Sequence, residues 1–472
     1  MGTMYRVVKN SIALVSVTIL ERGIGFLLPW YIARTLGKGP MGEYSTAISW
    51  IFVTLPLAIW GFDQLLLREI SRDREALSRY LVNASLVVVG SVTVTAVLLG
   101  LIINLFDYPP SLDRLLWVSA LFVLPLYTGS LLLETAIKSL ERMEWIVGIR
   151  TPLTLVRVGG SIYLLFHGVQ LEVVFLLLGV YYAATCLIYY FVIRFFVPNI
   201  KRTFDPLAVR QLAIHAIPFV LIGVFGITFK QVDRIVLSAL RSMEEIGIYS
   251  AGATVMAMVL LIAPAMMESL FPGLSRMHVS APQHLPEMVA RLLRLVWFIS
   301  VPIMLTTITI VRPAILLLFT TEYSASILIA QILALAIVPA FLSRLLYRII
   351  LASNNERTTL RIAAINSVIG VGLNLLLIPS MGLVGASIAT ISAECAGFLQ
   401  NLYFVHNRVV KISLWQTMGK PFLSAMSAAA TYWWIRQWNE YIALIVALSL
   451  YIGVAVYLSV ISKTDFFDIE TC

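Results

Sequence analysis

The sequence predicts an all-α polytopic membrane protein with 14 transmembrane helices. Of its 472 residues, 60% are hydrophobic and only 12% are charged, a balance far outside the range of soluble proteins. Apolar runs of about 20 residues recur along the chain, and each is long enough to cross about 30 Å of hydrocarbon. The runs are continuous and do not alternate with polar residues, which argues against a β-barrel.

The expected spans follow one another with short connections, so we predict no extramembrane domain. Their approximate ranges are 10–33, 43–65, 80–104, 114–137, 145–166, 171–194, 211–237, 246–270, 290–311, 324–350, 359–379, 382–405, 417–436 and 440–461. The first run has spanning length and no small-residue cleavage site, so we expect no cleavable signal peptide.

An internal repeat organises these spans. A shift of about 205 residues places GEYS at 42–45 over GIYS at 247–250, and Asp63 over Glu268. The same two halves align Gly159 with Gly370. Chance similarity between apolar helices is the alternative. We predict two pseudo-symmetric six-helix lobes around a central cavity, plus two extra C-terminal helices.

The repeat also predicts the domain organisation. The N-lobe takes residues 1–196, a cytoplasmic linker 197–210, and the C-lobe 211–406. The two extra spans and a C-terminal tail occupy 407–472. Paired bundles of this kind suit a transporter that rocks between inward-open and outward-open states.

The distribution of Lys and Arg residues indicates how the chain is oriented in the membrane. The net charge is +9, and its excess lies in short loops, so the positive-inside rule explains it better than nucleic-acid binding. Roughly 22 Lys and Arg residues lie at one set of span ends against roughly 8 at the other. We therefore expect both termini in the cytoplasm and the protein in the cytoplasmic membrane.

The sequence lacks the motifs of several classes of enzyme and metal-binding protein. The three cysteines have no disulfide or metal-ligand spacing, and the five histidines are scattered. There is no phosphate-binding GxxxxGK[ST] loop, HExxH or nucleophile elbow. We expect no enzyme and no cofactor, so transport must draw on an ion gradient, the membrane potential or the substrate gradient.

A polar stripe on the expected span 145–166 predicts an anion site. Arg150, Thr154, Arg157 and Ser161 follow the spacing i, i+4, i+7, i+11 and share one helix face. Two guanidinium groups on one face favour an anionic ligand, because their planar forks match phosphate oxygens. The alternative for Arg150, which lies nearer the cytoplasm, is that it simply snorkels to the interface.

Other buried charges extend this set. Arg22 and Glu21 lie near the middle of the first span, and each needs a partner from another helix, from water or from a ligand. An interhelical ion pair is the alternative to a ligand role. Arg344 and Arg348, one turn apart, repel each other unless an anion or an acid, with Glu134 and Glu268 as candidates, separates them. Glu134 can pair with Lys138 one turn away.

A second group of polar residues suggests ion coupling. Carboxylates, amides and hydroxyls at depth can bind a proton or a sodium ion. The residues in question are Asp233, Asn366, Asn374, Thr390 and Glu394. For Asp233 the alternative is a local salt bridge with Lys230 or Arg234.

Three stretches resemble the polysaccharide biosynthesis membrane proteins. They are IARTLGKGPMGEYSTAISW at 32–50, QVDRIVLSALRSMEEIGIYSAGATV at 231–255, and LASNNERTTLRIAAINSVIGVGLNLLLIPSMGLVGASIATISAE at 351–394. The last contains an IPxxGxxGAxxAT element. The chain resembles the Wzx-type lipid-linked oligosaccharide flippases of the MOP exporter superfamily.

The resemblance implies a function. A two-lobed bundle would flip a polyprenyl-diphosphate-linked oligosaccharide, such as an O-antigen, capsule or exopolysaccharide repeat unit, to the outer leaflet. The partners would be that glycan, the bilayer and a polysaccharide polymerase machinery. By position, Arg22 matches a diphosphate-binding arginine of related lipid II flippases, and Asp233, Asn374 and Thr390 match their cation site. Asn374 stands where an acid is expected, so Glu394 is a candidate protonatable group.

Three other readings stay open. A cation-coupled drug antiporter of the same superfamily would show a cavity dominated by acids and aromatic residues. A lipid II flippase would share the fold and the diphosphate chemistry. A polysaccharide polymerase or ligase usually has a large extracytoplasmic loop, and the outer loops expected here are only about ten residues long.

Overall fold

The structure is a computed structural model, and the described part of the chain is helical and without strands. It describes residues 20–73, 77–198, 204–261, 263, 285–353, 355–413 and 415–458. The predicted all-α class is confirmed for these residues. Residues 199–203 of the predicted linker, and Glu268, lie outside them.

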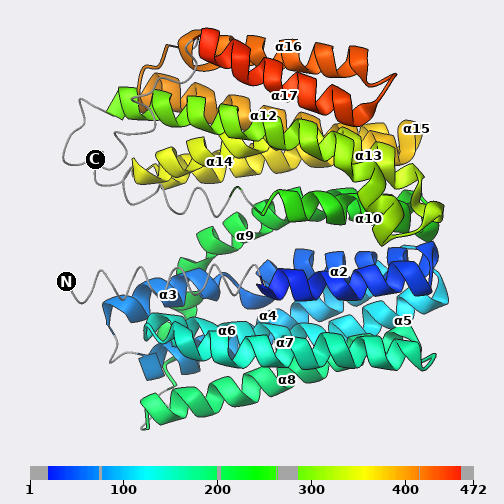
Figure 1. Ribbon diagram of the computed structural model, residues 1–472. Coiled ribbons are helices and arrows are strands. Elements are labelled where there is room, and N and C mark those ends of the chain that lie inside the picture. Colours follow the sequence, from blue (N-terminus) through cyan, green and yellow to red (C-terminus); the bar gives the residue numbers. More distant parts are fainter. Residues whose placement is uncertain are drawn as a thin grey trace. The chain divides into compact units, whose positions relative to one another are not determined.

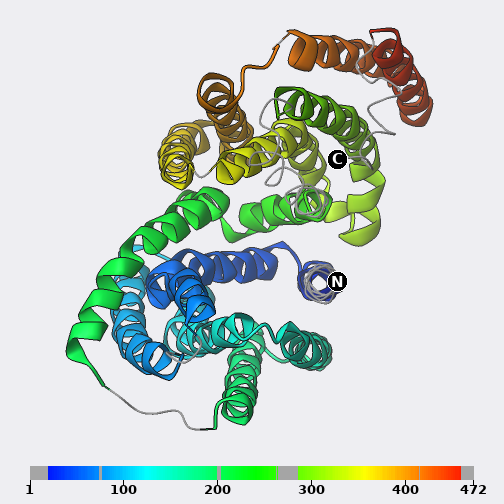
Figure 2. The same cartoon turned by 90° about the vertical axis from the view of Figure 1, so that its left-hand side faces the viewer.

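The chain divides into two compact units, Met1–Ser250 and Ala251–Cys472. The helices of the first unit are 20–35, α2 (Lys38–Ile59), α3 (Phe62–Arg72), α4 (Leu77–Leu105), α5 (Pro110–Val118), the π-helical turn η1 (Ser119–Val123), α6 (Leu124–Ser139), α7 (Met143–Phe166), α8 (Leu171–Phe196) and α9 (Pro206–Leu240). Helix α10 (Met243–Val259) crosses the boundary. Figure 1 shows α4, α6, α7 and α8 running side by side, and Figure 2 shows them closer to end-on.

The second unit holds the remaining helices. They are α12 (Leu285–Leu318), η3 (Thr321–Tyr323), α13 (Ala325–Ala334), α14 (Ile337–Ala352), α15 (Glu356–Phe404), η4 (Val405–Val409), η5 (Trp415–Gly419), α16 (Lys420–Ile435) and α17 (Glu440–Tyr457). Helix α14 packs against α15 and α12, and α16 packs against α17. The last pair lies side by side in both views (Figures 1 and 2). The lobe boundaries predicted from the repeat stay a prediction.

The helices are long and apolar enough for a membrane protein. Within the described residues, 8 helices meet length and hydropathy requirements for a span, or up to 9 if the bent pair α2–α3 counts as one. The predicted count of 14 is therefore not confirmed. Helix α15 has 49 residues but is broken at Gly382, whose φ is 56°. That break lies where the sequence predicts a turn between the spans 359–379 and 382–405.

The bend between α2 and α3 was not predicted. The two helices meet at 43°, with Trp60 and Gly61 both in the left-handed region. A Cβ at Gly61 would lie 2.8 Å from the backbone nitrogen of Val220 on α9, and the Trp60 indole donates to the Ala213 carbonyl at 3.0 Å. The bend therefore lies where α9 approaches the α2–α3 backbone closely. A glycine allows this approach because it has no side chain between the two backbones.

The internal repeat appears in the helix register. Helices α2 and α10 begin at Lys38 and Met243, which are separated by the same shift that aligns GEYS with GIYS. Gly42 packs against the carbonyl of Met243, and Gly247 packs against the carbonyl of Lys38; a Cβ at either glycine would overlap that carbonyl. Equivalent residues of the two repeats thus meet reciprocally at the start of these helices, with glycine permitting backbone contact.

Candidate substrate site

Helix α7 carries the predicted polar stripe, and the middle residues of this stripe contact α8. Thr154 and Ser161 are buried, at 5% and 0% exposure, while Arg150 and Arg157 are half-buried. The Thr154 and Tyr181 hydroxyl groups lie 3.4 Å apart, and the Arg157 guanidinium lies 5.5 Å from the centre of the Tyr181 ring. The four residues therefore share one face, as their spacing predicts.

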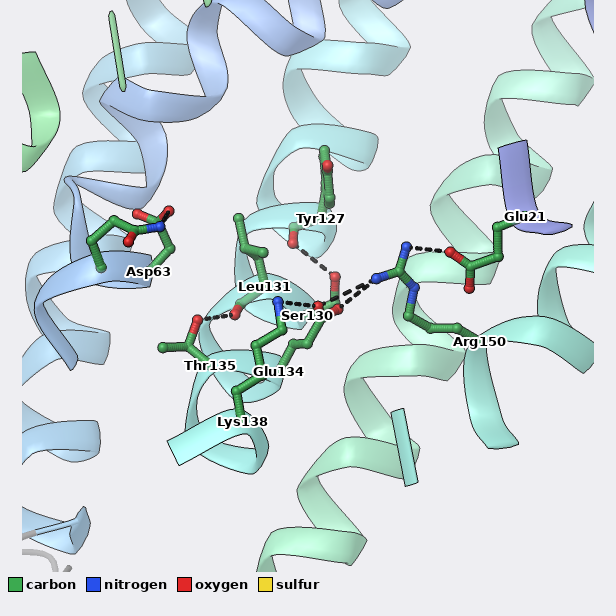
Figure 3. Close-up of polar contacts among 10 residues, drawn as sticks. Glu21, Asp63, Tyr127, Ser130, Leu131, Glu134, Thr135, Lys138 and Arg150 are labelled. Carbon is green, nitrogen blue, oxygen red and sulfur yellow. Dashed lines mark hydrogen bonds and ion pairs between the residues drawn. The ribbon is translucent and has the colours of Figure 1, made fainter. Parts of the chain in front are cut away.

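Arg150 is held between two carboxylates (Figure 3). Its Nη2 donates to Glu21 Oε2 at 2.7 Å, and its Nη1 donates to both oxygens of Glu134 at 3.3 Å. Lys138 Nζ lies 2.7 Å from Glu134 Oε1. The carboxylate side chains are only 12% and 9% exposed, so both need the cations to offset lost hydration.

These contacts decide between the alternative roles that the sequence left open for Glu21 and Glu134. Glu21 forms the interhelical ion pair that was one of its two expected roles, and the Glu134–Lys138 pair is confirmed. Arg150 faces the two acids, so simple snorkelling does not describe it. Two cations and two carboxylates balance one another in this network, and a direct ligand role for Arg150 stays a prediction that requires one of its ion pairs to open.

Arg157 differs from Arg150 in its surroundings. Within the described residues, the structure records no ion pair for it. Its neighbours are aromatic: Tyr127 and Tyr182 stack with ring centres 4.3 Å apart, and Tyr181 meets Tyr182 edge-on at 5.0 Å. A guanidinium over such rings gains from the ring quadrupole but keeps its full charge. Arg157 is therefore a half-buried cation that makes no ion pair within 4 Å of a carboxylate in the described residues, although its charge acts on Glu21 at longer range.

Arg22 lies one residue beyond Glu21 on helix 20–35, and its side chain is exposed. Adjacent residues on a helix point about 100° apart, so Glu21 can turn toward α7 while Arg22 points elsewhere. Among the residues that the structure describes, no hydrogen bond or ion pair is recorded for Arg22. Its diphosphate-binding role stays a prediction.

The predicted ion-coupling residues fall in both units. In the first, Asp233 accepts a hydrogen bond from the Tyr249 hydroxyl at 2.6 Å and another from the backbone N–H of Arg234 at 2.8 Å. The Arg234 guanidinium donates instead to Gln231 at 3.0 Å. Tyr249 is fully buried and belongs to the GIYS element, so this contact ties Asp233 to the repeat contact described above.

The second unit holds Asn374, Thr390 and Glu394 on α15. Asn374 is 2% exposed; its amide nitrogen donates to the Gly370 carbonyl at 2.7 Å, and its Oδ1 has no hydrogen-bond partner in the described part of the chain. Thr390 donates to its own helix at 3.0 Å, and Glu394 is half-buried one turn later. An oxygen-rich ion site here stays a prediction.

Sequence reasoning missed two polar contacts made by α15. Gln400 donates to Asn366 Oδ1 at 2.8 Å and so ties together the two arms of α15. Asn401, 4% exposed, donates to Ser343 on α14 at 3.0 Å. The signal was present as polar residues in an apolar run, but their pairing depends on how the arms fold back.

Arg344 and Arg348 lie on α14, half-buried. The Nη1 atom of Arg344 is buried without a hydrogen-bond partner among the described residues. Glu134, one of the acids expected to separate the two arginines, belongs to the first unit and pairs with Arg150 and Lys138. An anion near Arg344 stays a prediction.

Comparison with known proteins agrees with this architecture. The polysaccharide biosynthesis protein family matches residues 7–278, more than half of the chain. A probable flippase, AglR of Haloferax volcanii, is 22% identical over 458 residues, which cover 92% of this chain and 91% of that protein.

Solved structures share the fold. The lipid II flippase MurJ in an inward closed conformation superposes with a TM-score of 0.73 at 16% identity, covering 98% of this chain and 100% of MurJ. An inward-facing multidrug resistance MATE transporter of the MOP superfamily gives a TM-score of 0.67 at 12% identity, covering 84% and 98%. The expected resemblance is thus confirmed, and the chain belongs to the polysaccharide biosynthesis protein family.

Proposed function

We propose that this chain flips a polyprenyl-diphosphate-linked oligosaccharide from the cytoplasmic to the outer leaflet of the cytoplasmic membrane. Family and fold support a flippase of the MOP superfamily. The oligosaccharide, such as an O-antigen, capsule or exopolysaccharide repeat unit, and the polyprenyl carrier are the finer parts of the proposal.

The observation that carries the proposal is the contrast between Arg150 and Arg157. The first forms ion pairs with two carboxylates, whereas the second lies over the Tyr181 ring and makes no recorded ion pair within the described residues. A diphosphate cannot enter about 30 Å of hydrocarbon without a cationic, hydrated partner. The fork of Arg157 fits phosphate oxygens, and the Tyr181 hydroxyl, 3.4 Å from that of Thr154, offers a hydrogen bond to the attached sugar.

The same site suggests how the cargo is released. In alternating access, the two lobes expose the cargo first to one leaflet and then to the other. The membrane potential favours outward movement of an anion by about 2.3 kcal/mol per charge per 100 mV. Coupling to Na⁺ or H⁺ through Asp233, Asn374, Thr390 or Glu394 would add to it. Cytoplasmic termini and a polymerase partner belong to the same proposal.

The test uses Arg157→Ala and Arg157→Lys in a strain lacking the chromosomal gene. We expect the alanine variant to lose surface polysaccharide and accumulate the lipid-linked precursor, and lysine to restore only part of the transport because it lacks the fork. Arg142→Ala is the matched control, since Arg142 lies just before the same helix and pairs with Glu144 at 3.5 Å. Normal polysaccharide in Arg157→Ala at normal protein level would disprove the role of this site.

The same strain separates the alternatives. Drug sensitivity without a glycan defect would identify an antiporter, as in the multidrug transporters that share the fold. Rescue of a strain depleted of its lipid II flippase would identify lipid II as the cargo.

A further inference from the structure

A long groove lies on the opposite side of α6 from the Arg150 network. It has a volume of about 630 Å³ and is walled on one side by α4, from Ser85 to Asn104, and on the other by α5, η1 and α6. Its α6 wall is formed by Pro125, Gly129 and Leu132. These residues share one helix face, while Glu134 projects about 180° away from that face. The groove is therefore separate from the candidate substrate site.

The groove is chemically apolar along its length. Its polar lining residues are Ser85, Thr93 and Asn104. Each donates its hydrogen bond to a carbonyl three or four residues earlier in α4, at 2.7, 2.9 and 2.8 Å. Each of these side chains thus directs a donor to its own helix, and the walls, which are otherwise apolar, suit a hydrocarbon chain.

The dimensions fit a lipid tail. The α4 wall from Ser85 to Asn104 extends about 28 Å, close to the thickness of the hydrocarbon core. Gly100 lets the Trp117 ring pack directly against α4, because a Cβ at this position would come within 2.8 Å of the ring. The π-helical turn η1 forms part of the facing wall, a local widening that is frequent at functional sites.

One end of the groove is cationic. A second hollow of about 270 Å³ shares Ser85 and Leu132 with the first and is lined by Tyr190 and Arg194. Arg194 Nη1 donates to the Pro198 carbonyl at 2.9 Å, and no ion pair is recorded for it among the described residues. Four guanidinium N–H groups remain for another acceptor. In the orientation proposed from the charge bias, this end lies at the cytoplasmic leaflet, whose surface is anionic.

We propose that this groove binds one anionic phospholipid of the cytoplasmic leaflet, with its phosphate at Arg194 and one acyl chain between α4 and α6. The arginine supplies charge complementarity to the headgroup, and the apolar walls replace neighbouring lipid around the tail. The bound lipid would stay with the first unit as a resident component, separate from the transported cargo.

Native mass spectrometry of the full-length, delipidated chain tests this, with dioleoyl phosphatidylglycerol and dioleoyl phosphatidylcholine as probes. We expect one site that prefers phosphatidylglycerol by about fivefold, the effect of one basic residue at a membrane surface. Arg194→Gln should abolish the preference and retain weak binding of both lipids. Ala96→Trp, which fills the groove, should weaken both.

Two matched variants serve as controls. Val94→Trp adds the same indole to α4 at a residue that is 59% exposed and does not line the groove. Arg72→Gln removes a cation whose side chain is 71% exposed, at the end of α3. Both should bind as the wild type does.

Three results would overturn the proposal. Arg194→Gln could keep the fivefold preference, or Ala96→Trp and Val94→Trp could bind alike. Displacement of phosphatidylglycerol by an equimolar amount of undecaprenyl diphosphate would show that the occupant is a carrier lipid and not a resident phospholipid.

Discussion

The ion pair between Glu21 and Arg150 joins helix 20–35 to α7, and a double-mutant cycle measures its strength. The variants are Glu21→Gln, Arg150→Met and the two together. Glu21 Oε2 lies 2.7 Å from Nη2. Glu21→Gln removes the negative charge but keeps an acceptor, Arg150→Met removes the cation and its donors, and neither change adds bulk. The cycle isolates the energy of the pair from that of the remaining Glu134 contacts.

The structure sets the expected magnitude. Breaking a buried ion pair costs about 3–5 kcal/mol, whereas an exposed pair contributes about 0.2–1 kcal/mol. The Glu21 and Arg150 side chains are 12% and 35% exposed, so solvent screens one partner and not the other. We expect a coupling energy of about 1–2 kcal/mol. Glu21→Gln alone should cost about 1 kcal/mol, because Arg150 retains Glu134.

The assay is the free energy of unfolding by chemical denaturant in a mild detergent, for the four proteins side by side. The pair between Arg114 and Glu172 is the control, with side chains 59% and 25% exposed. Its coupling energy should stay below about 0.5 kcal/mol. If the Glu21 and Arg150 substitutions are additive within about 0.3 kcal/mol, the pair does not hold helix 20–35 in place and the reasoning is refuted.

Two further predictions concern the repeat contact. Gly42→Ala and Gly247→Ala should each destabilise the protein by about 1–3 kcal/mol, because a Cβ at either position overlaps a carbonyl of the other repeat. Gly39→Ala should be neutral, since a Cβ there would meet no atom within 4 Å. Thermal unfolding of the three variants checks this, and equal stability of all three would contradict it. Tyr249→Phe removes the hydroxyl that donates to Asp233 at 2.6 Å. It should lower the free energy of unfolding by about 1.5–3 kcal/mol, as expected for a hydrogen bond to a charged group. The effect should disappear in an Asp233→Ala background, and its persistence there would show that the hydroxyl acts elsewhere.

The helices could be predicted from the sequence because their cause is local. An apolar run of spanning length must satisfy its backbone internally, and a helix does so in any membrane setting. The turn at Gly382 and the matching starts of α2 and α10 follow from short sequence elements. The polar stripe on α7 likewise needed only helical spacing.

The bend at Trp60–Gly61 could not be predicted in the same way. Its position depends on α9, which approaches from about 150 residues later in the chain. The π-helical turn Ser119–Val123 also lies within an unbroken apolar run, where the hydropathy pattern carries no sign of it.

The sequence alone therefore determined that the described part of the chain is helical, and it predicted the repeat and the polar residues within the apolar spans. Only the tertiary structure decided that Arg150 forms ion pairs with Glu21 and Glu134 while Arg157, two turns away, lies over a tyrosine ring. The physical reason is range. Helix formation depends on backbone hydrogen bonds between residues four apart. The pairing of a buried charged side chain depends instead on which partner the packing of other helices brings within about 4 Å.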